Sequence, residues 1–159
     1  MKRKIKYAAY ALIFVLVIET ILLGLSSFRN SRCKEWGVKI SASEVTSTGL
    51  KLLTERKKCS VEDVLMLDWR YELQKRTLFG WKNVEPLNNK WSGGEKVSII
   101  ETGRMLTREI KWETAYGKLK PGIYRVKTQI VKQEWISSPE DERNKQDMRM
   151  LYATFCVNL

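Results

Sequence analysis

The chain has 159 residues, of which 43% are hydrophobic and 30% charged, a balance typical of one folded domain with an accessory segment rather than of a disordered chain. It contains no histidine, which argues against enzymes and metal sites that depend on this side chain. The formal net charge is +11 but the cations are scattered, so we expect solubility and no nucleic-acid partner. A partner of another anionic kind, such as teichoic acid, lipid headgroups or an acidic protein, stays open.

The N-terminus predicts membrane targeting. A basic tail at residues 1–6 precedes an apolar run at residues 7–25, YAAYALIFVLVIETILLGL. An ionised Glu19 costs about 3 kcal/mol on insertion, whereas the eleven Leu, Ile, Val and Phe residues of the run return about 5 kcal/mol. The run therefore predicts a single-pass transmembrane or signal-anchor helix in the cell membrane, with the N-terminus inside and the C-terminal domain outside.

A cleaved signal peptide is the alternative. Gly24-Leu25-Ser26 is a tolerable small-residue cleavage site, and cleavage there would release a secreted protein. A lipid anchor is not expected, because the first cysteine, Cys33, follows Arg-Asn-Ser-Arg rather than a box of apolar and small residues.

Beyond the helix, residues 26–35 are polar and predict a juxtamembrane linker, and residues 36–159 predict one β-sandwich domain. Short alternating patterns recur with turn signals between them, at roughly the ten-residue spacing of sandwich strands. Strands are expected at residues 38–42, 50–54, 71–76, 81–84, 97–100, 106–112, 123–132 and 151–157, the last two pairing as a hairpin.

The segments between these strands carry further signals. Ser60-Val-Glu-Asp63 has the spacing of a helix capping box and predicts one helical turn over residues 64–67. Thr77-Leu-Phe-Gly80 predicts a hairpin turn with Gly80 at a positive φ. The charged run at residues 138–147 predicts a solvated loop, and a short helix capped by Ser138 with Pro139 at its first position is the alternative.

The stretch from Trp112 to Arg125, WETAYGKLKPGIYR, resembles the bacterial immunoglobulin-like domain family of exported and membrane-anchored Gram-positive proteins. The resemblance runs from near Val38 to the C-terminus. It implies an all-β fold, an immunoglobulin-like β-sandwich preceded by one N-terminal transmembrane or signal helix. The motif residues that carry the resemblance are Tyr116, Gly117, Leu119, Pro121, Gly122 and Tyr124.

These motif residues imply a structural role. Leu119 should fill the core, Gly122 should take a conformation that other residues resist, and Tyr124 should hydrogen-bond back to the backbone as a tyrosine corner does. The motif specifies a fold and no reaction. We therefore expect a domain that is not an enzyme, has no cofactor or metal, and binds or scaffolds a protein or an anionic cell-envelope ligand.

The resemblance also bears on the three cysteines. In such a sandwich the first two strands are antiparallel, so Cys33 and Cys59 would lie at one end of the domain and Cys156 at the other. A disulfide between Cys33 and Cys59 is the preferred expectation, and three free thiols are the alternative.

Two tryptophans outside the strand patterns, Trp91 and Trp135, are the candidate binding anchors. A smaller resemblance, to the intracellular proteinase inhibitor fold of bacilli, implies an alternative function in which an exposed loop at residues 86–94 enters a protease cleft.

Overall fold

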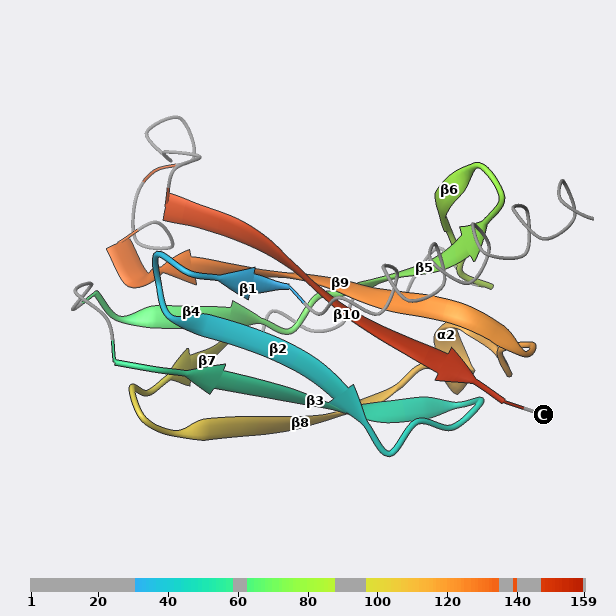
Figure 1. The fold of residues 1–159 in the computed structure, drawn as a ribbon, viewed down its shortest axis with the longest axis horizontal. Coiled ribbons are helices and arrows are strands. Elements are labelled where there is room, and N and C mark those ends of the chain that lie inside the picture. Colours follow the sequence, from blue (N-terminus) through green and yellow to red (C-terminus); the bar gives the residue numbers. More distant parts are fainter. Residues whose placement is uncertain (1–30, 59–62, 88–96, 135–138, 140–146, 159) are drawn as a thin grey trace, which may run out of the picture.

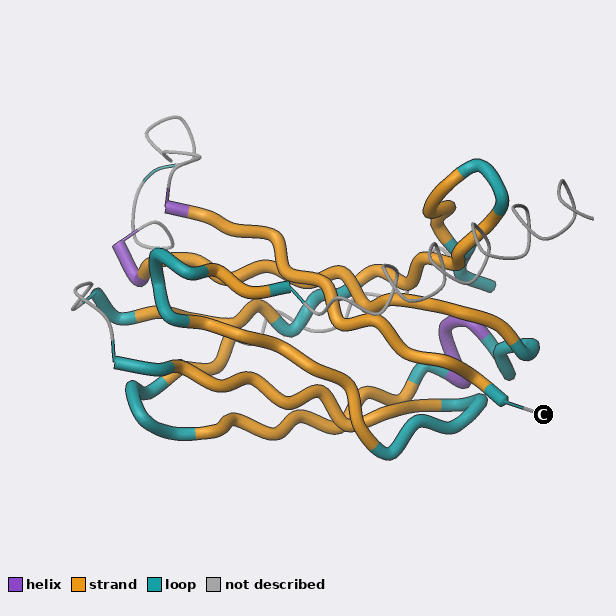
Figure 2. Tube along the Cα trace, in the orientation of Figure 1, coloured by secondary structure: helices purple, strands orange, loops and turns teal. Residues whose placement is uncertain are grey.

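The structure, a computed structural model, describes residues 31–58, 63–87, 97–134, 139 and 147–158. These residues form two layers of antiparallel β-sheet (Figures 1 and 2). The first sheet has the order β1-β2-β3-β8, with β1 at Arg32–Cys33, β2 at Val38–Ser43, β3 at Gly49–Arg56 and β8 at Met105–Lys111. The second sheet contains β4 (Leu65–Asp68), β5 (Glu72–Thr77), β6 (Gly80–Asn83), β7 (Val97–Ile100), β9 (Gly122–Lys132) and β10 (Met148–Val157).

The second sheet is built around β9. One edge of β9 pairs with β10 from Gly122 to Val131. The other edge pairs first with β5 and then with β4, so these two short strands form one line that is interrupted at residues 69–71. On the outer side of that line, β6 pairs with β5 and β7 pairs with β4. The interruption places polar backbone groups in the middle of the sheet.

Alternation along the strands creates the core. In β9 every second residue from Tyr124 to Ile130 is buried, while Arg125, Lys127 and Gln129 are only partly buried. This period of two is what a strand with one covered face requires. The buried side chains of both sheets form one cluster, whose largest members are Trp36 and Trp112, at 1% and 0% exposure. The all-β, two-sheet architecture predicted from the sequence is thereby confirmed.

The predicted strands are all present, but the helical turn predicted over residues 64–67 is wrong. Residues 65–67 belong to β4, in which Leu65 and Leu67 are fully buried and pair with β7 on one side and β9 on the other. Burial of alternate leucines and pairing on both edges outweigh a local capping signal. Ser60, which carried that signal, lies outside the described residues.

At the N-terminal end, the sheet starts inside the segment predicted as a linker. Arg32 and Cys33 of β1 pair with Lys39 and Val38 of β2. The predicted membrane helix at residues 7–25 lies outside the described residues. Within the part that the structure describes, no helix is long and apolar enough to cross a membrane.

The connection from β8 to β9 carries the chain from the first sheet to the second. It contains the short helix α2 (Glu113–Tyr116). Leu119 is 7% exposed and belongs to the core cluster. The Tyr124 hydroxyl donates a hydrogen bond to the carbonyl of Lys120 at 2.8 Å, the backbone contact that defines a tyrosine corner.

The remaining motif residues shape the same connection. Gly117 follows α2 with a φ of 69°, and Gly122 opens β9 with a φ of 154°, both in the region that favours glycine. Pro121 is exposed between them, and the Tyr116 ring is half-buried with its centroid 6.5 Å from that of Tyr71.

Two of the three cysteines lie within the described residues. Cys33 and Cys156 are each partly buried and are not bonded to each other. Cys33 packs against the core where β1 meets the start of β2, whereas Cys156 is the penultimate residue of β10. Cys59 lies outside the described residues, so its bridge to Cys33 stays a prediction.

Candidate functional site

The outer faces of the two sheets differ in chemistry. On the first sheet, exposed charges are neutralised by close ion pairs, Lys51 with Glu44 at 2.6 Å and Lys111 with Glu109 at 3.3 Å. On the second sheet, arginines stack on aromatic rings. Since Trp, Tyr and Arg are the side chains most enriched at binding hot spots, the outer face of the second sheet is the candidate site.

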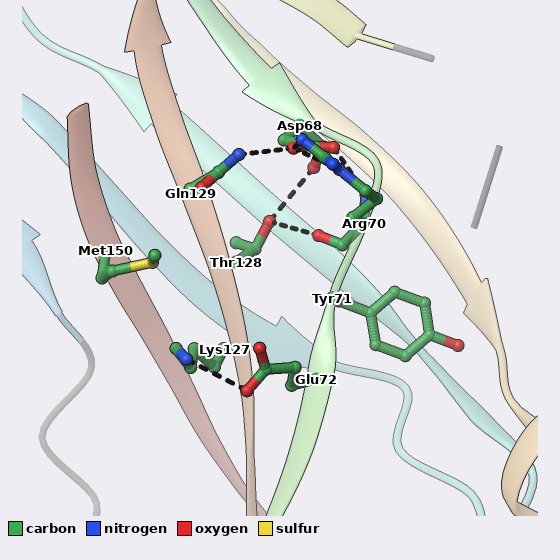
Figure 3. Close-up of a pocket in the computed structure, with 8 residues that line it drawn as sticks. All are labelled: Asp68, Arg70, Tyr71, Glu72, Lys127, Thr128, Gln129 and Met150. Carbon is green, nitrogen blue, oxygen red and sulfur yellow. Dashed lines mark hydrogen bonds and ion pairs between the residues drawn. The ribbon is translucent and has the colours of Figure 1, made fainter. Parts of the chain in front are cut away.

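A hollow of about 250 Å³ lies on this face beside the interruption between β4 and β5 (Figure 3). Its lining comes from the interruption, from β5 and from the facing strands β9 and β10. The lining residues are Asp68, Arg70, Tyr71, Glu72, Lys127, Thr128, Gln129 and Met150.

Asp68 is the buried charge of the hollow, with a side chain that is 6% exposed. Its carboxylate accepts hydrogen bonds from the Arg70 backbone N–H at 2.8 Å, from Arg70 Nε at 2.8 Å and from Gln129 Nε2 at 2.6 Å. Burial by itself would raise the pKa of Asp68, but the hydrogen bonds and the charge of Arg70 outweigh it and hold that pKa below its ordinary value. Asp68 therefore stays ionised and fixes the loop, and it is poorly suited to exchange protons near neutral pH.

Replacing Asp68 with asparagine is expected to lower the free energy of unfolding at pH 7 by about 2 kcal/mol, because hydrogen bonds to a charged acceptor are lost. The folded-state pKa lies below the unfolded value of about 3.9, so this contribution is fully present above pH 4 and disappears as the pH falls through the folded pKa. Urea unfolding from pH 7 down to pH 2.5 should show wild type and variant converging.

Asp63→Asn is the matched control, because Asp63 forms a more exposed ion pair with Lys132 at 2.9 Å and should change stability by less than about 1 kcal/mol. A difference between Asp68→Asn and wild type that is the same at every pH would contradict the role assigned to the ionised carboxylate.

The interruption is also held from the opposite sheet. Arg108 on β8 is 6% exposed and points through the core. Its Nη1 donates to the carbonyl of Asp68 at 3.0 Å and its Nη2 to that of Trp69 at 2.6 Å. Thr128 Oγ1 adds hydrogen bonds to the carbonyls of Asp68 and Arg70, both at 3.1 Å. The carbonyls that the broken strand exposes are thus satisfied by side chains.

Next to the hollow, four side chains form what we call the cation–aromatic cluster: Arg76, Trp81, Arg125 and Tyr152. The Arg125 guanidinium lies 4.4 Å from the ring centroid of Trp81 and 4.1 Å from that of Tyr152. Arg76 lies 5.6 Å from the Trp81 ring centroid. Arg125 Nε also donates to Gln74 Oε1 at 2.6 Å. Partial burial lowers the pKa of Arg125 from its ordinary value, though the guanidinium stays charged.

The side chains of the cluster are already ordered before a ligand binds. Arg125 sits on the central strand β9 and its rings come from β6 and β10, so three strands hold one guanidinium in a single geometry. Side chains that are already ordered lose less conformational entropy when a ligand docks. The cluster therefore suits recognition of a planar or anionic group.

The structure does not bring the residues singled out by the sequence into this cluster. Trp91, Trp135 and most of the inhibitor-like loop at residues 86–94 fall outside the described residues. The corner motif lies in the connection after β8 and supports the fold. Arg125, Tyr152 and Trp81 were not predicted as site residues. Alternation does indicate that Arg125 points outward, but it does not indicate which rings meet it.

Among the described residues, no three Cys, Asp or Glu side chains come together as a group that could hold a metal ion.

Comparison with protein families gives one match. Residues 34–148 fit the family model of the bacterial Ig-like domain, a range that spans most of the chain and includes the strands β2 to β9. Neither the curated proteins nor the solved structures yield a match to this sequence.

Proposed function

The chain belongs to the bacterial Ig-like domain family, and from this membership we propose that it is a non-enzymatic binding or scaffold domain, held outside the cell membrane by its N-terminal segment, with a ligand site on the outer face of the second sheet. The cation–aromatic cluster is the observation that carries the site. Immunoglobulin-like sandwiches serve many functions, so the site and not the fold has to specify the ligand.

The charges of this face favour an anionic ligand. Arg76 and Arg125 stack on rings and have no carboxylate among their described contacts, and Lys82 is exposed on the neighbouring strand. The acids of the face are already engaged, Asp68 by Arg70 and Glu72 by Lys127 at 3.0 Å. A phosphate or carboxylate polymer of the cell envelope, or an acidic protein segment, would supply the missing negative charge.

The anchoring rests on the sequence of residues 1–25, a basic tail followed by an apolar run long enough to span a bilayer. With the basic tail inside, the domain lies outside, where an anionic envelope polymer is accessible. Without protease, the full-length chain carrying a C-terminal tag should be found in the membrane fraction. When protease is added to intact cells, the tag should be digested.

The test uses the full-length chain in detergent with poly(glycerol phosphate) and poly-glutamate as probes. Arg125→Gln is expected to weaken binding to at least one probe about tenfold, because a charge-assisted contact is lost. The cluster keeps its other aromatic and polar groups, so the fold should remain intact.

Lys39→Gln is the matched control. It removes one positive charge from the exposed outer face of the first sheet and should leave affinity within about twofold. Equal losses from the two variants would mean that net charge alone drives binding, and no binding of either probe would refute an anionic ligand.

A further inference from the structure

The turn between β5 and β6 exposes two large apolar side chains. Leu78 is 94% exposed and Phe79 is 99% exposed, the highest values of any large hydrophobic residue in the described chain. The hairpin rises away from the two layers near one end of the sandwich (Figure 1). Turns are usually made of Gly, Pro, Asn, Asp or Ser, and Gly80, with a φ of 122°, already supplies the glycine this turn needs. Leu78 and Phe79 are therefore not required by the turn itself.

The strands that carry this hairpin tip, defined as Leu78 and Phe79, are basic. Residues 73–84 contain Lys75, Arg76 and Lys82 and no acidic residue. Lys75 and Lys82 are directly paired across the two strands. Like charges opposite each other destabilise a hairpin, and an external anion would relieve this repulsion.

The described chain begins level with the start of β5. Ser31 N–H donates to the carbonyl of Tyr152 at 2.8 Å, and Tyr152 is paired with Lys127, which is paired with Glu72 at the start of β5. From this level β1 runs away from the hairpin (Figure 1). The tip lies six residues beyond Glu72, about 20 Å along an extended strand.

The reach of the N-terminal chain matches this distance. Five residues, 26–30, connect Leu25, the end of the predicted membrane helix, to Ser31, and the six steps between these two residues span at most about 20 Å. A membrane helix ending at Leu25 can thus place the bilayer surface level with the hairpin tip.

We propose that the hairpin tip inserts into the interface of the anionic bilayer in which the chain is anchored, with Leu78 and Phe79 among the acyl chains and Lys75, Arg76 and Lys82 against lipid phosphates. We assign lipid as the partner because exposed apolar side chains beside cations suit the membrane interface, where the apolar groups meet acyl chains and the cations meet anionic headgroups. The inference rests on the anchoring in the proposed function. It orients the sandwich with its hairpin end toward the membrane.

The test places a photocrosslinker in the full-length chain. Phe79→p-benzoylphenylalanine puts the probe at the tip, and Met105→p-benzoylphenylalanine puts it on a 60% exposed apolar residue at the other end of the sandwich. Both proteins are reconstituted into vesicles containing about 30% phosphatidylglycerol, floated, irradiated and analysed for lipid adducts. The tip probe should give at least about tenfold more lipid adduct than the Met105 probe.

A charge variant makes the assignment specific. Adding Lys75→Gln, Arg76→Gln and Lys82→Gln to the tip-probe protein should reduce the adduct severalfold in phosphatidylglycerol vesicles and much less in phosphatidylcholine vesicles. If the protein floats with the vesicles but gives equal amounts of lipid adduct at the two positions, the insertion of the hairpin tip is refuted and the membrane anchoring is not. Chains that fail to float overturn the anchoring with it. In cells, a tip adduct to a protein in place of lipid would also overturn it.

Discussion

Replacing Arg108 with methionine is expected to lower the free energy of unfolding by about 3 kcal/mol, a large share of what a domain of this size has. Methionine keeps much of the apolar stem but removes the donors to the carbonyls of Asp68 and Trp69. The Asp68 carbonyl lies at the end of β4 and the Trp69 carbonyl in the break before β5, so one guanidinium holds both sides of the break. The guanidinium also lies 5.0 Å from the Trp69 ring centroid and 5.5 Å from that of Tyr71.

Urea unfolding followed by tryptophan fluorescence measures this loss. Arg104→Met is the matched control, since Arg104 is exposed and pairs only with Glu101 at 2.9 Å among its described ion pairs; it should cost less than about 0.5 kcal/mol. Arg108→Lys keeps the charge but cannot reproduce the fork of donors and should fall between the two. A cost below about 1 kcal/mol for Arg108→Met would show that the interrupted strand does not depend on the opposite sheet.

Replacing Trp112 with alanine should cost about 3–5 kcal/mol, the usual range for emptying a buried tryptophan site. The Trp112 ring is 0% exposed and stacks on Phe155 of β10 with centroids 5.5 Å apart. Its Nε1 donates to the carbonyl of Ser47 at 2.9 Å. One side chain thus joins the end of β8, the turn before β3 and the last strand of the opposite sheet.

Two variants separate these contributions. Trp112→Phe keeps an aromatic ring on Phe155 and loses only the indole donor, so about 1–2 kcal/mol should be lost. Trp81→Ala removes the same kind of side chain from the outer face, where it is only partly buried, and should cost clearly less. If thermal unfolding midpoints for Trp112→Ala and Trp81→Ala fell equally, the stack on Phe155 would not be central to the core.

Most of the fold was predictable because a strand with one buried face has an alternating pattern of apolar and polar residues in its own sequence. In β9 the alternation of Tyr124, Val126, Thr128 and Ile130 with polar residues is set by one covered face, and it could be recognised without knowing the cover. The corner motif is equally local, since Tyr124 reaches a carbonyl only four residues upstream. The helical turn predicted before residue 68 failed because a capping signal is also local, and pairing with β7 and β9 overrode it.

The amino-acid sequence by itself therefore determined eight of the ten strands of the described chain, the alternation along β9, the corner after β8 and the membership in an immunoglobulin-like family. Only the tertiary structure decided which outward residues meet. Arg125 is stacked between Trp81 and Tyr152 because β5 and β10 pair with β9 in one particular register, and Arg108 reaches the break between β4 and β5 because the two sheets pack at one particular distance. Periodicity within a strand specifies a face, whereas register between strands and packing between sheets are set by all the side chains of the core together.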